Sequence, residues 1–133
     1  MSDIIVIKPI SVTDSERSVI KEQKYAYINR LNFSGAFYNP IRFVSAVLNN
    51  MIEHLGKTEP MDLPIGGFYA HSFDFEKIRA HSIVFFDSLE KGGVSAEVIQ
   101  YIKDLHELTL VELAIMTDKS QKEFEAQQAA KGN

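Results

Sequence analysis

The stretch from residue 75 to residue 116 constrains the fold more than any other part of this chain. It holds two helix-length segments, 75–91 and 96–117, with apolar side chains on nearly every face. The pair Gly92-Gly93 between them is expected to form the turn that joins the two helices. Helices of this kind lie in a core or beneath a partner. We therefore expect both helices to be buried on most sides, with more apolar helix surface than a small monomer readily covers.

Length and composition limit the classes of function. The 133 residues suit one domain with a core. The net charge is −4 and the basic residues are interspersed with acids, which argues against a basic nucleic-acid face. Cysteine is absent, so disulfides and thiolate chemistry are excluded. No stretch has the apolar length of a membrane span or the pattern of a signal peptide. We expect an intracellular protein with no nucleic-acid or membrane partner.

The N-terminal third predicts a strand followed by a helix. Residues 4–12 are rich in β-branched side chains, and Pro9 limits them to an edge strand or an extended arm. Thr13 to Glu16 match a capping box, so a helix should follow from residue 14 to about residue 32. Residues 25–33 also alternate as a strand pairing with 4–12 would. Helix is the preferred interpretation, and the strand remains an alternative.

Cap residues predict the remaining elements. Asn39 and Pro40 are typical of a helix start, and Gly56 should close that helix after residue 55. Residues 57–73 form a long loop, of a length that is often functional. Asp74 should cap helix 75–91, and Ser95 should cap helix 96–117, with a break or a new cap at residue 118. The polar residues beyond it should form a solvated helical tail with one large apolar side chain, at position 124.

These elements together predict a mainly α protein. The expected fold is a small bundle of three to four helices over residues 14–118. A short N-terminal strand or arm at 1–13 precedes the bundle, and a polar helical tail at 119–133 follows it.

The side chains that could carry chemistry are scattered. None of the four histidines forms a helical Glu-x-x-His pair, and no nucleophile elbow, phosphate loop or dinucleotide motif is present. We expect no metal and no cofactor. An alternative is a ligand or catalytic site near the 57–73 loop, built from Tyr69, His71, Asp74, Glu76 and His81. His81 lies in an apolar helix, either as a buried base with a lowered pKa or as a core-edge residue bonded to a carbonyl.

Aromatic residues are concentrated in one part of the chain. Ten of the 14 lie between residues 25 and 75. Exposed aromatic clusters mark binding surfaces, whereas loops 33–39 and 65–73 could instead fold their rings back onto the bundle. The partner-binding residues predicted in the arm and the two loops are Ile5, Ile7, Phe37, Tyr38, Phe68 and Tyr69.

Residues 4–14, IIVIKPISVTD, resemble the opening of some bacteriophage tail and baseplate proteins. Those proteins begin with a similar apolar run, a Lys-Pro or near equivalent, and Thr-Asp. The likeness ends at residue 15, where a charged helix begins. It implies a virion subunit whose N-terminal arm docks on a neighbour, located in a bacterial cytoplasm or in the virion.

The sequence therefore predicts a non-catalytic interaction or assembly subunit, expected to form a homo-oligomer or to bind a protein partner. If the chain holds no second strand, the N-terminal strand would find its partner in another subunit. Two alternatives stay open. One is the small enzyme or ligand-binding domain around His71, Glu76 and His81. The other is a monomeric inhibitor or immunity-type binder of a host protein, with one large exposed aromatic patch.

Overall fold

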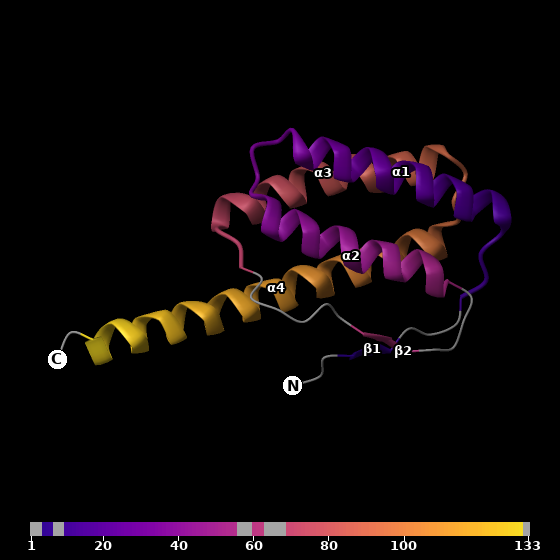
Figure 1. Ribbon diagram of the computed structural model, residues 1–133. Helices are drawn as coiled ribbons and strands as arrows, with labels where there is room; N and C mark the ends of the chain where they lie inside the picture. Colours follow the sequence, from indigo (N-terminus) through magenta and orange to yellow (C-terminus); the bar gives the residue numbers. More distant parts are fainter. Residues whose placement is uncertain (1–3, 7–9, 56–59, 63–68, 132–133) are drawn as a thin grey trace.

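The computed structural model describes residues 4–6, 10–55, 60–62 and 69–131. Within them lie four helices, α1 (Asp14–Asn32), α2 (Tyr38–His54), α3 (Ser72–Lys91) and α4 (Ala96–Lys131). Two three-residue strands, β1 (Ile4–Val6) and β2 (Pro60–Asp62), pair beside the helices. Figure 1 shows the helices packed as a bundle with the strand pair below it and the end of α4 projecting from one side. The predicted mainly α bundle is confirmed.

Helix α1 begins at the predicted capping box. The amide of Glu16 donates to Thr13 Oγ1 at 3.0 Å, and the amide of Thr13 donates to Glu16 Oε1 at 3.0 Å. The helix continues to residue 32, so the alternative strand over 25–33 is wrong. The physical reason is the spacing of Ile20, Tyr27 and Leu31, seven and four residues apart, which places all three on one buried face.

Two predicted helix starts are shifted. Helix α2 begins at Tyr38, after an N-cap residue with no side-chain bond, because the side chain of Asn39 instead accepts from the amide of Tyr69. Helix α3 begins at residue 72, and its N-cap is His71. The predicted cap, Asp74, is instead the third residue of the helix, and its side chain accepts from the amide of the N-cap residue. The predicted cap Gly56 lies outside the described residues.

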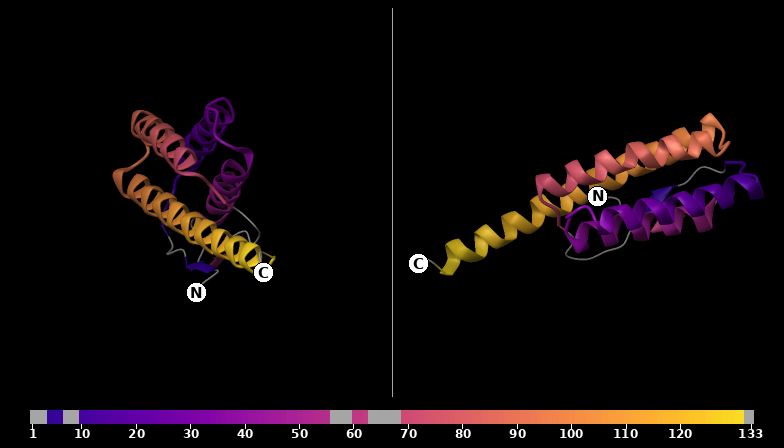
Figure 2. Two further views of the ribbon diagram at one scale, coloured as in Figure 1. Left: turned by 90° about the vertical axis from the view of Figure 1, so that its left-hand side faces the viewer. Right: turned by 90° about the horizontal axis from the view of Figure 1, so that it is seen from above.

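Helices α2 and α3 run in the same direction. The guanidinium of Arg17 donates to the carbonyls of Ile52 and Leu55, at 2.7 and 3.0 Å, so α2 ends beside the start of α1. The amide of Phe37 donates to Asp74, so α3 begins at the opposite end of the bundle. The segment between α2 and α3 therefore has to connect the two ends, which explains the length of the predicted loop. The end-on view in Figure 2 shows the resulting four-cornered arrangement.

The N-terminal strand has its partner within the chain. Strand β2 lies in the connection between α2 and α3 and pairs with β1 in antiparallel register, with Ile5 opposite Met61. A strand from another subunit was expected only if the chain held no second strand. Because β2 is present, β1 does not need one. Docking of the arm on a neighbour stays a prediction.

Helix α4 is a single helix through the predicted break at Asp118. Ser95 caps it as predicted, accepting from the amide of residue 98 at 3.4 Å. Asp118 forms an ion pair with Lys122 at 3.0 Å, four residues on, so it supports the helix instead of ending it. The expectation that α4 is buried on most sides is wrong, because the side chains of its outer face are exposed: Leu108, Val111 and Ile115. Among the helices described, none combines the length and hydropathy that a membrane crossing needs.

The close approach of α3 to α1 makes Gly92 sensitive to substitution. A Cβ atom at this position would lie 2.6 Å from Cγ1 of Val19 and 3.2 Å from the carbonyl oxygen of Ser88. We expect Gly92→Ala to lower the free energy of unfolding by about 1 kcal/mol, since crowding a packed contact forces neighbours to shift. Urea denaturation would measure the change. The cost should shrink when Val19→Ala removes the crowded methyl, and an equal cost in both backgrounds would contradict this explanation.

Candidate functional site

Four aromatic rings in mutual contact lie at the end of the bundle where α1 turns into α2 and where α3 begins, and Tyr38 follows one of them, Phe37, in the chain. We call this surface the end patch and define it by its members: Phe37, Tyr38, Tyr69, His71 and Phe73. The exposed fractions of the four phenylalanine and tyrosine residues are 55, 71, 50 and 38% in chain order. Exposed rings on one surface are typical of binding sites, because they bury much area at small entropic cost.

Ring-to-ring contacts organise the end patch. The ring centroid of Phe37 lies 5.4 Å from that of His71 and 6.0 Å from that of Phe73, both edge to face. Tyr69 meets His71 in the same manner at 6.2 Å. These are preferred aromatic geometries, so the rings support one another while their outer faces stay in solvent.

A single buried carboxylate holds the backbone beneath these rings. Asp74 is fully buried. Its Oδ1 accepts from the amide of Phe37 and its Oδ2 accepts from the amide of His71, each at 2.9 Å. Two further hydrogen bonds hold the segment just before α3. The amide of Ala70 donates to the hydroxyl of Thr117 at 2.9 Å, and the amide of Tyr69 donates to the side chain of Asn39. The patch is thus attached to α2, α3 and α4.

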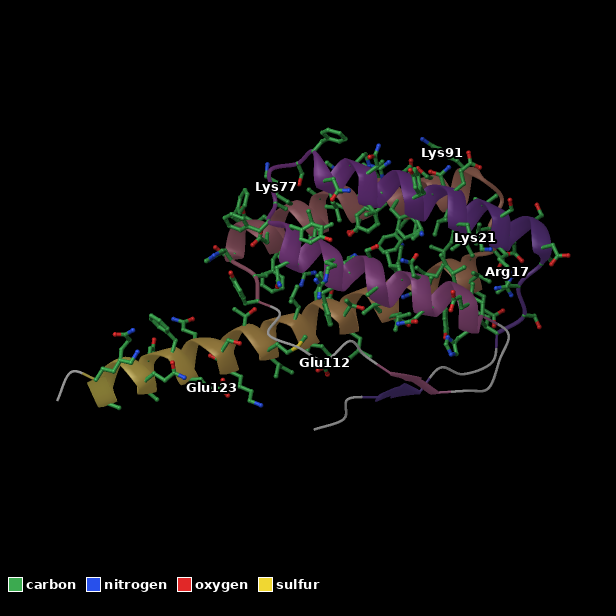
Figure 3. The ribbon with its side chains drawn as sticks, in the orientation of Figure 1. Arg17, Lys21, Lys77, Lys91, Glu112 and Glu123 are labelled. Carbon is green, nitrogen blue, oxygen red and sulfur yellow. The ribbon has the colours of Figure 1, made fainter. Side chains whose placement is uncertain are left out.

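Charged side chains of α3 border the end patch. The ammonium of Lys77 lies 5.9 Å from the ring centroid of Phe73, within range of a cation–π interaction. Figure 3 shows Lys77 at this end of the bundle. The exposed acid Glu76 lies three residues after Phe73, about 60° from it around α3, so both signs of charge are present here.

The structure gathers three of the six predicted partner-binding residues. Phe37 and Tyr69 both contact His71, and Tyr38 follows Phe37 in the chain. All three rings are exposed, so they are not folded back onto the bundle. Ile5 belongs to β1, but its side chain lies outside the described part of the structure. Ile7 and Phe68 lie outside the described residues altogether. Their roles in binding stay predictions.

The structure brings together three of the five residues of the alternative site, Tyr69, His71 and Asp74, and a ligand or catalytic role for them stays a prediction. Asp74 has both oxygens engaged with backbone amides. Glu76 and His81 are five residues apart on α3, so they point about 140° apart. His71 takes part in the end patch instead. In the described part of the chain, no three His, Asp or Glu side chains are close enough to hold a metal ion.

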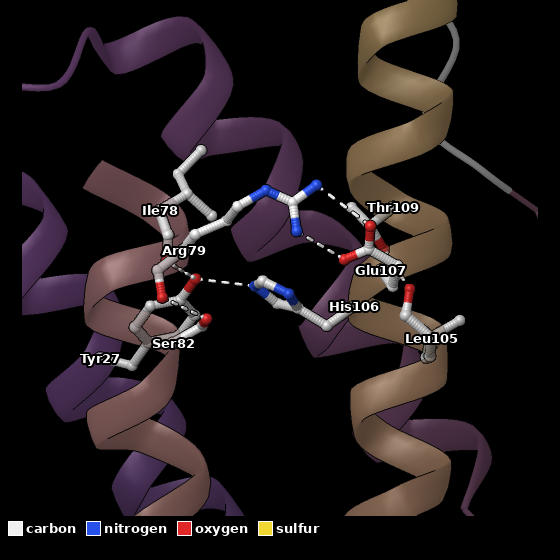
Figure 4. Close-up of polar contacts among 8 residues, drawn as sticks. All are labelled: Tyr27, Ile78, Arg79, Ser82, Leu105, His106, Glu107 and Thr109. Atoms are coloured by element: carbon white, nitrogen blue, oxygen red, sulfur yellow. Dashed lines mark hydrogen bonds and ion pairs between the residues drawn. The ribbon is translucent and has the colours of Figure 1, made fainter. Parts of the chain in front are cut away.

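The buried histidine is His106, which pairs with Tyr27 between α1, α3 and α4 (Figure 4). The phenol oxygen lies 2.8 Å from His106 Nε2 and donates to the carbonyl of Ile78 at 3.3 Å. A phenol has one proton, so both bonds form only when Nε2 carries a hydrogen and donates to the phenol oxygen. Burial lowers the pKa of His106 to about 4 and raises the pKa of Tyr27, which keeps both groups neutral.

An open groove of about 460 Å³ lies outside this pair, between α3 and α4. Its rim includes Arg79 and Glu107, joined by two hydrogen bonds at 2.8 and 3.0 Å that lower the pKa of the carboxylate. The pair is half exposed, so its contribution to stability is small.

Nucleophilic catalysis needs a base beside an activated hydroxyl or thiol. Ser82 on the rim instead donates to the carbonyl of residue 79 at 2.7 Å. The Arg79–Glu107 and Tyr27–His106 interactions each connect two helices of the bundle.

Sequence reasoning selected His81 and missed His106. A signal for His106 was present in its spacing, because it lies four residues after Ile102 and seven before Leu113 on the buried face of α4. The partner Tyr27 is 79 residues away in the chain, so no local pattern indicates the pair.

No known protein family, curated protein or solved structure matches this chain.

Proposed function

We propose that this protein is a non-catalytic assembly subunit that associates with further copies of itself through the end patch. The observation that carries the proposal is the group of exposed rings, Phe37, Tyr38, Tyr69 and Phe73, on a backbone fixed by buried hydrogen bonds. A rigid aromatic surface loses little entropy when it binds, which favours association.

The likeness of residues 4–14 to phage tail and baseplate proteins is compatible with an assembly subunit, and a virion role stays a prediction. Strand β1 has a partner in β2, so the proposal is built on the end patch, and docking of the arm on a neighbour stays a separate prediction.

Removing two rings of the end patch tests the proposal. We expect Phe37→Ala combined with Tyr38→Ala to weaken association strongly, because hot-spot aromatics cost about 2 kcal/mol or more each when truncated. Light scattering behind a sizing column should show the oligomer mass falling toward the 15.0 kDa monomer. Ile83→Ala is the matched control, since it removes an exposed apolar side chain from α3 outside the patch.

An unchanged oligomer mass in the double variant would contradict the use of the end patch. A native protein that stays at the monomer mass up to high concentration would contradict self-association. That second outcome would favour the alternative of a monomeric inhibitor-type binder, whose expected mark is one large exposed aromatic patch.

A further inference from the structure

The C-terminal part of α4 lies beyond the bundle. Thr117 still contacts the body of the protein through its bond to the amide of Ala70, whereas residues 121–131 are all exposed. At 1.5 Å per residue, residues 118–131 extend about 20 Å past that point. Figures 1 and 2 show this extension leaving the bundle at the end where α3 begins, the same end that carries the end patch. We call residues 118–131 the extension.

The extension has one large apolar side chain, and its direction is set by the helix. Phe124 is 60% exposed. It follows Thr117 by seven residues and Leu110 by fourteen, and residues seven apart on a helix lie within about 20° of each other. Leu110 is buried in the core. Phe124 therefore continues the inward-facing side of α4 into the space beyond the end of the bundle.

We infer that Phe124 and the extension of one copy cover the end patch of a second copy, in a reciprocal dimer. This inference rests on the proposed function and names the partner surface. Because α4 is one continuous helix, the extension leads away from its own end patch and cannot fold back onto it. A second copy related by a twofold axis places its end patch beneath the extension and receives the same contact in return, which closes the assembly.

Acidic side chains flank the ring of the extension. Glu123 and Glu125 lie on either side of Phe124, each about 100° around the helix. Over residues 118–131 as a whole, three acids are balanced by three lysines. The end patch has Lys77 against Phe73, and Figure 3 shows the labelled Glu123 on the extension and Lys77 at the bundle end. The proposed contact thus sets Phe124 and its two flanking acids against rings bordered by Lys77.

The extension also lacks support within its own chain. A helix of this length is marginal in water by itself, and a helix that is polar nearly all round needs i,i+4 pairs or a partner. Two such pairs are present, Asp118 with Lys122 at 3.0 Å and Gln121 with Glu125 at 3.4 Å. Contact with the end patch of a second copy would add the apolar burial that the extension does not find in its own bundle.

The first test is Phe124→Ala in the full-length protein. One hot-spot ring contributes a factor of about thirty to a dissociation constant, and a reciprocal dimer loses two, so we expect the dimer to weaken roughly a thousandfold. Light scattering over a concentration series measures this. Phe124 is not part of the hydrophobic core, so at protein concentrations low enough for both proteins to be monomeric the variant should unfold like the native protein. Ile83→Ala should leave the dimer unchanged.

The second test uses the absence of cysteine from the chain. One preparation carries Gln128→Cys, one helical turn after Phe124, so that the Phe124 ring is kept, and the other carries Tyr69→Cys; the two are mixed under mild oxidation. We expect a disulfide-linked pair of the two different chains on a non-reducing gel. A mixture of Gln128→Cys with Ile83→Cys is the control and should give no mixed pair.

The outcomes separate this inference from the proposed function. If Phe37→Ala with Tyr38→Ala dissociates the oligomer while Phe124→Ala does not, the end patch is used but the extension is not its partner, and the inference is overturned. Mixed disulfides that form equally with position 83 would also overturn it. A native protein that is monomeric overturns both. Loss of the dimer in both variants, with specific cross-linking to position 69, supports both.

Discussion

Replacing Asp74 by alanine should lower the free energy of unfolding by about 3 kcal/mol. The carboxylate is fully buried and accepts from the amides of Phe37 and His71. Removing it leaves two backbone donors without their partner, and hydrogen bonds to a carboxylate each contribute about 1.5–3 kcal/mol. The start of α3 also loses its capping interaction, which is worth about 1 kcal/mol in typical helices.

The same substitution should disturb the end patch. Asp74 connects the α1–α2 turn to the start of α3, so its loss releases Phe37 from His71 and Phe73. Urea denaturation at fixed protein concentration measures the stability, and light scattering measures association. Asp74→Asn is the matched variant, because its amide oxygen retains one acceptor and its cost should be smaller. A loss below about 1 kcal/mol for Asp74→Ala would contradict a central structural role for this carboxylate.

Acid should destabilise the protein through His106. Burial among α1, α3 and α4 lowers the pKa of His106 from 6.5 to about 4. The nearby Glu107 raises this pKa by more than Arg79 lowers it, but it does not offset the effect of burial. The unfolded chain takes up a proton as the pH falls below 6.5, whereas the folded protein resists it until about pH 4. Stability is therefore complete above pH 6.5 and decreases between pH 6.5 and pH 4, by about 3 kcal/mol in total.

A titration of stability against pH tests this expectation. His106→Gln is the informative variant, because its amide can still donate to the phenol oxygen of Tyr27 but does not titrate. Its stability should be nearly constant between pH 6.5 and 5. The pKa values of Glu16 and Glu107 are lowered from the ordinary glutamate value of 4.5, so these two groups reduce the stability mainly at pH values below 4.5. An equal slope in the native protein and the variant over that range would show that another group is responsible.

Local signals predicted most of the helices. The capping pair Thr13 and Glu16 and the cap Ser95 have partners three residues away in the sequence, so their roles can be recognised without a fold. The start of α3 could not be placed in this way. Asp74 is bonded to Phe37, 37 residues earlier, and that contact depends on how α1, α2 and α3 pack.

The sequence could predict which kind of residue forms the candidate site, but not how those residues come together in space. The concentration of rings between residues 25 and 75 indicated an aromatic surface, and Phe37, Tyr38 and Tyr69 are exposed in it. The sequence does not specify that α2 and α3 run in the same direction, and that arrangement brings Tyr69 and Phe73 beside the α1–α2 turn. The role inferred for Phe124 required knowing that α4 continues past Asp118 as one helix.

The mass of the native protein in solution, compared with that of Phe37→Ala combined with Tyr38→Ala, tests the assembly function most directly. Light scattering over a concentration series should give a discrete oligomer for the native chain, and we expect twice the 15.0 kDa monomer mass. The double variant should approach the monomer mass at the same concentrations. A native protein that remains monomeric, or a double variant that retains the full oligomer mass, would contradict assembly through the end patch.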